Sequence, residues 1–340
     1  MFTYSSPASR NLIRAERAML KSAEPIMVLS NFGAQKEQPK NSTDTIVFRR
    51  FLPVDAGANG APSVTANDYI LAEGVIPNAK SLTPQDVTIT LQQYGVLMKL
   101  TNKVEDIYED DIPAEMTKKV GEHMGTLAEL ICFGQVKSGT NVLYTNGSAR
   151  SSVNTAISLN ALRKAARTLE SAHAQRVTSK LAAGPNFNTS PVSAGYLVFV
   201  HTDLESDYRN LPGFVPVEEY AGGGKLASER EIGKVEQFRI ITSPYFKAWL
   251  NSGSATTNGM YSAGANNVDV YPSLVVAEEA WGQVALKGQG AVSPTYLPAK
   301  QKTHSNPLGQ VGYVGASFWK AAVRLNENWM VRIESGATAL

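Results

Sequence analysis

The segment of this 340-residue chain that comes closest to a binding motif is a glycine-rich run ending in lysine, Gly222-Gly223-Gly224-Lys225. Its composition is that of a phosphate-binding loop, in which backbone N–H groups and the lysine bind phosphate oxygens. That motif requires an earlier glycine where this chain has Glu219, and a Ser or Thr where it has Leu226. We therefore predict a flexible loop here and no nucleotide site.

The histidines do not form a site either. They are His123, His173, His201 and His304, and none is spaced with another histidine, or with the one cysteine, as zinc ligands are. His201 lies close to Asp203, but no Gly-x-Ser-x-Gly segment supplies a nucleophile. An enzyme usually gathers a convergent set of titratable residues. The sequence therefore predicts no catalytic residue, no metal site and no cofactor, and we expect a protein that is not an enzyme.

A cluster of carboxylates precedes the longest apolar-periodic segment. It consists of Glu105, Asp106, Glu109, Asp110 and Asp111. Carboxylates bind hard cations, but these five lack the spacing of a calcium-binding loop. We interpret the cluster as a solvated or subunit-facing charged patch. Asp110 and Asp111 also suit the positive end of the dipole of a helix that begins near Pro113.

The composition favours a folded chain with much of its surface in contact. Hydrophobic residues make up 43% of the chain and charged residues only 18%, with 27 Gly and 17 Pro. Few charges suit a protein that covers itself with copies of itself. Cys132 falls in an apolar helical pattern and is predicted to be a core residue. A lone cysteine also excludes an intrachain disulfide.

The charge distribution is uneven. Residues 1–50 hold eight basic and four acidic side chains, while the whole chain has a net charge of +2. The basic excess can meet an acidic partner or nucleic acid, or it can be solvated surface. No apolar run reaches transmembrane length, and the start of the chain lacks the pattern of a signal peptide. We expect a soluble, cytoplasmic protein with no membrane partner.

The periodicity of the first half predicts an arm, a loop and a long helix. Residues 1–44 show no second periodic face, so we expect them to be disordered or ordered by a neighbouring subunit. Strand-like segments at 45–52 and 87–92 frame a stretch rich in turn residues, which predicts an extended β-loop. From about residue 113 an apolar stripe predicts a helix of about six turns. The stripe comprises Met116, Val120, Met124, Leu127 and Ile131.

The second half mixes helices and strands, so the predicted class is α+β. Ser158 is a candidate N-cap for a helix with the apolar stripe Leu162, Ala165, Ala166 and Leu169. Thr202 and Glu205 have capping-box spacing for a helix that ends near residue 211. Residues 195–200 indicate a buried strand and 216–233 a loop. Further strands are predicted at 235–242, 268–277, 318–325 and 329–334.

Eight short motifs follow these elements in order. They are Phe48-Arg-Arg-Phe-Leu-Pro53, Glu73-Gly-Val75, Val87-Thr-Ile-Thr-Leu-Gln-Gln-Tyr-Gly95, Val104-Glu-Asp-Ile107, Gly139-Thr-Asn-Val142, Glu231-Ile-Gly233, Val270-Tyr-Pro-Ser-Leu274 and Asn328-Trp-Met-Val-Arg-Ile-Glu334. Each motif alone is weak, but together, over about residues 40–335, they are fairly specific. In order and spacing the chain resembles the major capsid protein family of tailed double-stranded DNA bacteriophages.

The resemblance implies the Johnson fold, with its N-arm, extended β-loop, peripheral domain with a long spine helix, and axial domain. On this chain those parts correspond to 1–44 for the arm, 45–104 for the loop, 105–155 and 284–318 for the peripheral domain, and 156–283 and 319–340 for the axial domain. The implied function is structural: copies assemble as hexamers and pentamers into an icosahedral shell around the double-stranded DNA genome. The implied location is the virion capsid, assembled in the cytoplasm of the bacterial host.

The implied partners are other copies of the chain, a separate scaffold, portal and decoration proteins, and packaged DNA through non-specific contact. Arg49 and Arg50, at the root of the loop, are expected to pair with carboxylates of a neighbour, with the 105–111 cluster as the candidate. Some relatives cross-link a loop lysine to an asparagine of a neighbour. Lys80 is the only lysine between residues 41 and 98 and thus the only candidate, and we do not expect this cross-link.

Two other functions stay open at this point. An encapsulin-type nanocompartment shell protein shares the fold and encloses protein cargo instead of DNA. A soluble α+β enzyme with an unrecognised site belongs to a different class. It predicts a small closed oligomer and a convergent polar pocket, whereas a shell protein predicts very large particles.

Overall fold

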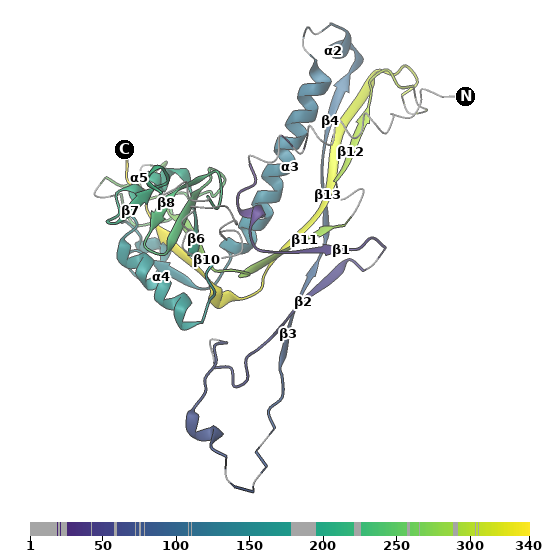
Figure 1. The fold of residues 1–340 in the computed structure, drawn as a ribbon. Coiled ribbons are helices and arrows are strands. Elements are labelled where there is room, and N and C mark those ends of the chain that lie inside the picture. Colours follow the sequence, from purple (N-terminus) through teal and green to yellow (C-terminus); the bar gives the residue numbers. More distant parts are fainter. Residues whose placement is uncertain are drawn as a thin grey trace. The chain divides into compact units, whose positions relative to one another are not determined.

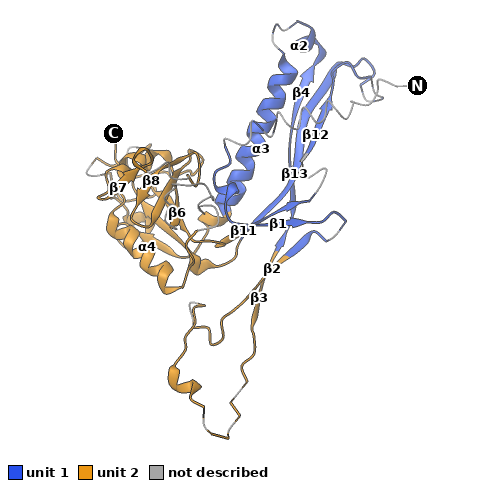
Figure 2. Ribbon diagram, viewed as in Figure 1, with its two compact units in different colours: residues 1–46, 89–134, 282–323 blue, residues 47–88, 135–281, 324–340 orange. Residues whose placement is uncertain are grey.

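The computed structural model describes residues 19, 21, 26–41, 43–57, 60–71, 73–74, 76–77, 79–107, 109, 111–177, 195–220, 226–256, 259–264, 266–287, 292–302, 304 and 306–340. The chain forms two compact units (Figures 1 and 2). Unit 1 comprises residues 1–46, 89–134 and 282–323, and unit 2 comprises residues 47–88, 135–281 and 324–340. Helices and strands are both present and do not alternate regularly, since β8 to β13 follow one another without a helix, which confirms the predicted α+β class.

Unit 1 is built on a five-stranded sheet. Its strand order is β1-β11-β13-β12, and β4 pairs antiparallel along β13. The elements are η1 (Leu29–Asn31), β1 (Ala34–Gln38), β4 (Gln92–Thr101), α2 (Asn102–Ile107), α3 (Ile112–Lys137), β11 (Trp281–Leu286), β12 (Val292–Leu297) and β13 (Val311–Arg324), of which α3, β11 and β13 extend past the unit boundary.

The predicted apolar stripe packs α3 on this sheet. Val120 and Met124 are buried in one core cluster with Val314 of β13. At the start of the helix the Asp111 carboxylate accepts the Ala114 N–H at 3.3 Å, which satisfies one of the free N–H groups of the first turn. The long helix is therefore confirmed, and at 26 residues it is slightly longer than predicted.

Part of the N-terminal segment is ordered by its own chain. Residues 29–31 form η1, and β1 pairs in parallel with β11, from Ala34 opposite Gly282 to Gln38 opposite Leu286. The prediction that residues 1–44 are disordered or need a neighbour is therefore wrong for these residues. The partner strand lies more than 240 residues away in the sequence, so no local pattern could indicate the pairing.

Unit 2 is built on a seven-stranded mixed sheet of order β5-β14-β10-β6-β9-β8-β7. Its elements are β5 (Val142–Tyr144), η3 (Arg150–Ser152), α4 (Leu159–Ser171), β6 (Tyr196–Val200), η4 (Thr202–Leu204), α5 (Glu205–Arg209), β7 (Phe214–Pro216), η5 (Val217–Glu219), β8 (Glu231–Val235), β9 (Phe238–Thr242), β10 (Tyr271–Val276), η6 (Glu327–Trp329) and β14 (Met330–Ser335).

Helix α4 covers one face of this sheet. Its predicted stripe is buried, and the core cluster that contains it includes the alternate residues Tyr196, Val198 and Val200 of β6. The predicted N-cap is present: the Ser158 hydroxyl accepts the Ala161 N–H at 3.3 Å. Both the helix and the buried strand were therefore predicted correctly from local patterns.

Three local predictions in unit 2 are wrong. Residues 216–233 are not only loop, because β8 begins at Glu231. The single strand predicted at 235–242 is instead the turn and second strand of the β8–β9 hairpin, with Glu236 at a φ of 49°. The capping box is absent, since Thr202 lies inside η4 and the N-cap of α5 is Leu204, which makes no side-chain capping hydrogen bond.

Residues 45–90 form a thin hairpin, and its residues 47–88 belong to unit 2. Strands β2 (Thr45–Phe51) and β3 (Pro84–Thr90) form a two-stranded sheet, and residues 52–83, which include η2 (Ala66–Tyr69), connect them (Figure 1). The extended β-loop is therefore present where the turn-rich composition indicated it.

We predict that Ser158→Ala lowers the free energy of unfolding by about 1 kcal/mol, because the first turn of α4 loses its side-chain cap. Urea unfolding followed by circular dichroism measures this difference. Ser171→Ala, at the other end of the same helix, is the matched control and should change the value by less than about 0.5 kcal/mol. Equal effects of the two substitutions would contradict the assigned cap.

Candidate subunit-contact surfaces

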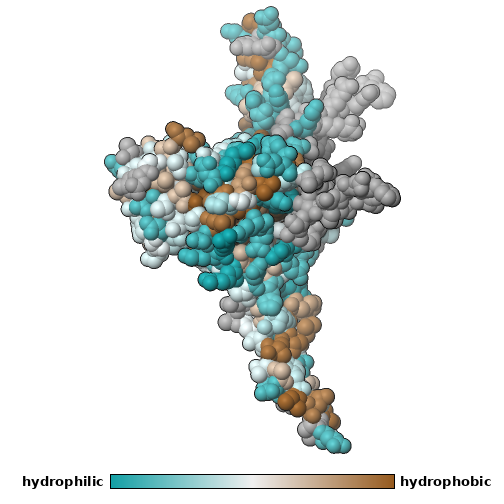
Figure 3. Space-filling view, turned by 60° about the vertical axis from the view of Figure 1, so that its left-hand side comes forward, coloured by the Kyte–Doolittle hydropathy of each residue, from teal (hydrophilic) through white to brown (hydrophobic). Residues whose placement is uncertain are grey.

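The loop between β2 and β3 exposes many large apolar side chains. They are Val54, Val64, Tyr69, Ile70, Leu71, Ile76 and Leu82, and Ile76 is 91% exposed; Phe51, the last residue of β2, is exposed as well. Figure 3 shows hydrophobic residues in brown on this loop, at the lower end of the view. So many exposed large apolar side chains on one loop are typical of an interaction site. The sequence analysis identified the loop but not these residues, although their apolar character was visible in it.

A polar cluster holds the loop in shape. Lys80 Nζ donates to both carboxylate oxygens of Asp55, at 2.8 and 2.9 Å, and the Tyr69 hydroxyl donates to the same carboxylate. The hydrogen bond from Lys80 lowers the pKa of Asp55, and the pKa of Lys80 is raised in return. These contacts join the start, the middle and the end of the loop. The one lysine considered for a cross-link is therefore engaged within its own chain.

The root of the loop is also tied internally. The Arg49 guanidinium donates two hydrogen bonds of 2.7 Å to the Asp86 carboxylate, and Arg50 Nε donates to the Gln85 side chain at 2.8 Å. Burial lowers the pKa of Arg50. The pairing of both arginines with a neighbour's carboxylates stays a prediction, and Arg49 would have to exchange Asp86 for such a partner.

The carboxylates of the acidic cluster make different contacts. Asp106 forms an ion pair of 2.6 Å with Lys300, and Asp111 caps α3 as described above. Glu109 is exposed, Glu105 is partly buried, and Asp110 lies outside the described residues. Within the described part of the chain, no group of three or more His, Cys, Asp or Glu could hold a metal ion. The described carboxylates of this segment thus lie in α2 or just before α3, and the described residues form no cation site there.

Of the two segments that suggested a nucleotide or catalytic site, the structure describes one. The run Gly222–Lys225 lies outside the described residues. The His201 ring accepts the Asp203 N–H at 3.1 Å and lies 3.2 Å from the Pro244 carbonyl oxygen, so it joins two segments of backbone.

A buried carboxylate that the sequence analysis missed anchors the N-terminal segment. Glu129 of α3 is completely buried and accepts the backbone N–H groups of Val28, Leu29 and Ser30, at 3.2, 2.6 and 3.0 Å. Burial raises the pKa of this carboxyl, against the opposing effect of the three hydrogen bonds. The available signal was the spacing of Glu129 with Cys132, Phe133 and Val136, an apolar face of the helix outside the predicted stripe, because a buried charge needs dedicated partners.

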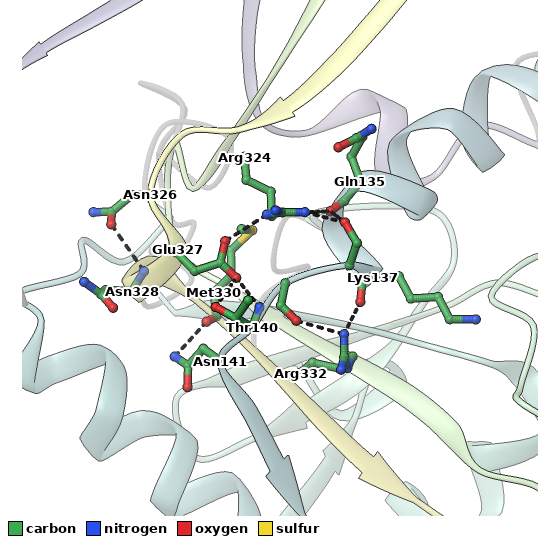
Figure 4. Close-up of polar contacts among 12 residues, drawn as sticks. Gln135, Lys137, Thr140, Asn141, Arg324, Asn326, Glu327, Asn328, Met330 and Arg332 are labelled. Carbon is green, nitrogen blue, oxygen red and sulfur yellow. Dashed lines mark hydrogen bonds and ion pairs between the residues drawn. The ribbon is translucent and has the colours of Figure 1, made fainter. Parts of the chain in front are cut away.

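The end of α3 is held by two arginines that come from later in the chain (Figure 4). Arg324 donates to the Gln135 carbonyl at 3.1 Å, and Arg332 donates to the carbonyls of Lys137 and Gly139. The last carbonyls of a helix lack intrahelical partners and carry the negative end of its dipole, so guanidinium groups stabilise them.

A second set of contacts ties the same helix end to β14 (Figure 4). Glu327 accepts a hydrogen bond from Arg324 at 2.8 Å and others from the backbone and hydroxyl of Thr140. Asn141 Nδ2 donates to the Met330 carbonyl at 2.9 Å. The motifs Gly139–Val142 and Asn328–Glu334, which are far apart in the sequence, therefore meet in one network.

Comparison with known proteins decides the family. Residues 84–297, more than half of the chain, match the family model described as phage capsid protein. The chain belongs to this phage capsid protein family. Proteins of this family are structural components of the phage virion, and the chain is not an enzyme.

Among relatives of this capsid protein, the major capsid protein of Pseudomonas phage KPP21 is 22% identical over 268 residues. That alignment covers 73% of this chain and 66% of the relative. In the part of the chain that the structure describes, no helix has the length and apolarity needed to cross a membrane.

Solved phage capsids share the fold of this capsid protein. The capsid of Ralstonia phage GP4 matches with a TM-score of 0.63 at 13% identity, covering 89% of this chain and 87% of that one. The capsid of cyanophage Pam1 matches with a TM-score of 0.58 at 12% identity, covering 99% and 96%. At such low identity the likeness shows the fold alone, and it confirms the predicted Johnson fold.

We predict that Glu129→Ala lowers the free energy of unfolding of the capsid protein by at least about 2 kcal/mol, because three buried N–H groups lose their acceptor. Chemical denaturation gives the energy, and hydrogen exchange should accelerate at residues 28–38. Glu122→Ala on the same helix removes an exposed ion pair with Lys119 and should cost less than about 1 kcal/mol. The anchor would be refuted if both variants were equally stable.

Proposed function

We propose that copies of this chain assemble, as hexamers and pentamers, into an icosahedral shell that encloses a double-stranded DNA phage genome. The observation that carries the proposal is the loop at residues 52–83, whose apolar side chains are uncovered in the single chain. Fully burying one Leu or Ile side chain contributes about 1.5–3 kcal/mol. Six Val, Leu and Ile side chains of this loop are exposed, Val54, Val64, Ile70, Leu71, Ile76 and Leu82, and together they give a strong drive to associate.

The loop is shaped for contact with another subunit. A two-stranded ribbon cannot form a core of its own, and within the described residues neither β2 nor β3 pairs with a further strand. The Asp55–Tyr69–Lys80 cluster shapes the loop before association, which reduces the entropy lost on binding. Many contacts of moderate strength then give a closed shell that is stable as a whole.

The domain assignment follows from the same proposal. Residues 105–155 and 284–318 form the peripheral domain, supported by the long helix α3 and strands β12 and β13. Residues 156–283 and 319–340 form the axial domain, supported by the sheet that α4 covers. Residues 1–44 are the arm and 45–104 the extended loop.

Further partners belong to this proposal. They are a separate scaffold protein, a portal protein and decoration proteins. Assembly takes place in the cytoplasm of the bacterial host. Packaged DNA is contacted without sequence specificity, and the basic excess of residues 1–50 supports this contact. A shell around protein cargo, as in encapsulin-type compartments, is the competing function and differs in the contents of the particle.

The proposal predicts that the purified full chain forms shells, tubes or hexameric rings in negative-stain electron microscopy and light scattering. Ile70→Asp combined with Ile76→Asp should raise the concentration needed for assembly at least tenfold, because each aspartate would be desolvated in the contact. The folded monomer should keep its melting temperature, since these side chains are 75% and 91% exposed.

The matched control is Ile70→Val combined with Ile76→Val, which keeps the apolar surface and should assemble within threefold of the unchanged chain. A chain that stays monomeric at high concentration, also with a phage scaffold present, would refute the shell. Nuclease-protected DNA in particles from infected cells supports the genome role, whereas protein cargo without DNA would favour the compartment.

A further inference from the structure

The turn that follows β5 contains the dipeptide Asn146-Gly147, and both residues are exposed on unit 2. Asparagine is thermolabile. It is most labile before glycine, because glycine has no side chain to cover the backbone nitrogen that attacks the asparagine amide. The sequence has two further Asn-Gly pairs, but their asparagines, Asn59 and Asn258, lie outside the described residues. The contacts of Asn146 and Gly147 therefore decide whether the folded chain can react at a described position.

The fold requires the glycine of this pair. Gly147 has a φ of 70°, which lies in the left-handed region that glycine adopts most readily. A Cβ atom at this position would lie only 2.4 Å from the Cβ atom of Ser152, at the end of η3. Another residue would therefore force the loop to shift. The uncovered backbone nitrogen after Asn146 thus follows from the way this turn folds.

The groups that would react are accessible to water. Within the described part of the chain, the Gly147 N–H forms no hydrogen bond, so the nitrogen can lose its proton without any local opening. The Asn146 side chain is exposed, and its Nδ2 donates to Oδ1 of Asn154 at 2.8 Å. The attacking nitrogen and the carbonyl carbon that it attacks belong to neighbouring residues, which favours closure of a ring.

We propose that Asn146 is a site of spontaneous deamidation in the folded chain. The Gly147 nitrogen loses its proton to hydroxide and forms a bond to Asn146 Cγ. The bond between Cγ and Nδ2 breaks, and Nδ2 takes up a proton and leaves as ammonia. Water then opens the succinimide ring at one of its two carbonyl carbons, which gives aspartate or isoaspartate at this position. The reaction consumes one water molecule and needs no oxidant, reductant or enzyme.

Deamidation changes the charge and one contact of the loop. Each converted copy gains one negative charge, so the formal net charge of the chain falls from +2 to +1. The donor Nδ2 is replaced by a carboxylate oxygen, which would face Oδ1 of Asn154 and could no longer donate to it. The loop at residues 145–154 therefore loses a hydrogen bond that closes it. This modification concerns the single chain and does not depend on the proposed shell.

Peptide mapping by mass spectrometry of the full folded chain tests the site. After incubation in mildly alkaline buffer prepared with heavy-oxygen water, we expect aspartate or isoaspartate at position 146 with one heavy oxygen atom, because water opens the ring. Conversion should be slower in mildly acidic buffer, since the nitrogen attacks after it has lost its proton. Asn154 is the control in the same loop and should remain an amide, because the β-branched Thr155 follows it.

Two variants separate the chemistry from the fold. Asn146→Gln keeps an amide but has to close a larger ring, so it should convert at least about tenfold more slowly. Asn146→Asp reproduces one product without the reaction. It should have the same isoelectric point as the converted chain, and hydrogen exchange at residues 145–154 should be faster than in the unchanged chain, because the contact with Asn154 is lost.

The peptide that contains Asn146, cut from the unfolded chain, gives the rate without the fold. We expect the folded chain to convert within about tenfold of that rate, because the Gly147 N–H is already free. An amide that persists in the folded chain while the peptide converts would show that the fold protects Asn146, and the proposal would be wrong. Equal conversion of Asn146→Gln would also overturn it. Each result is obtained with monomers, so it is independent of whether shells form.

Discussion

A thin hairpin cannot cover its own apolar side chains, and this constraint governs what the chain does. Residues 52–83 connect two strands that have no second layer, so Ile70, Leu71 and Ile76 remain in contact with water in the single chain. In a monomeric protein such a loop would promote aggregation. In the shell that we propose, another copy covers this loop, and closure of the shell limits further association.

The loop can serve this purpose because its shape is set within its own chain. Arg49 and Asp86 bind at the root, and Asp55, Tyr69 and Lys80 bind across the loop. These exposed ion pairs contribute little stability individually. Their effect is to restrict the conformations of a segment without a core, so that less entropy is lost when the segment is buried.

At the C-terminal end of α3, charged side chains stabilise the helix terminus. Arg324 and Arg332 satisfy carbonyl groups that a helix terminus leaves free, and Glu327 and Glu334 hold the two arginines in place. Arg332 also lies over the Trp249 ring, 5.4 Å from its centre, so one side chain joins the helix end to the segment around Trp249.

The sequence by itself determined the elements whose signals are local. The stripes of α3 and α4, the Ser158 cap, the buried strand β6 and the turn-rich loop all depend on residues within a few positions of one another. The order of the motifs also indicated the family. Tertiary structure alone decided the role of Glu129, the pairing of β1 with β11 and the meeting of Lys137, Arg150 and Arg332 at Trp249. Those partners lie tens to hundreds of residues apart, and an isolated charge in a sequence does not reveal which distant group will satisfy it.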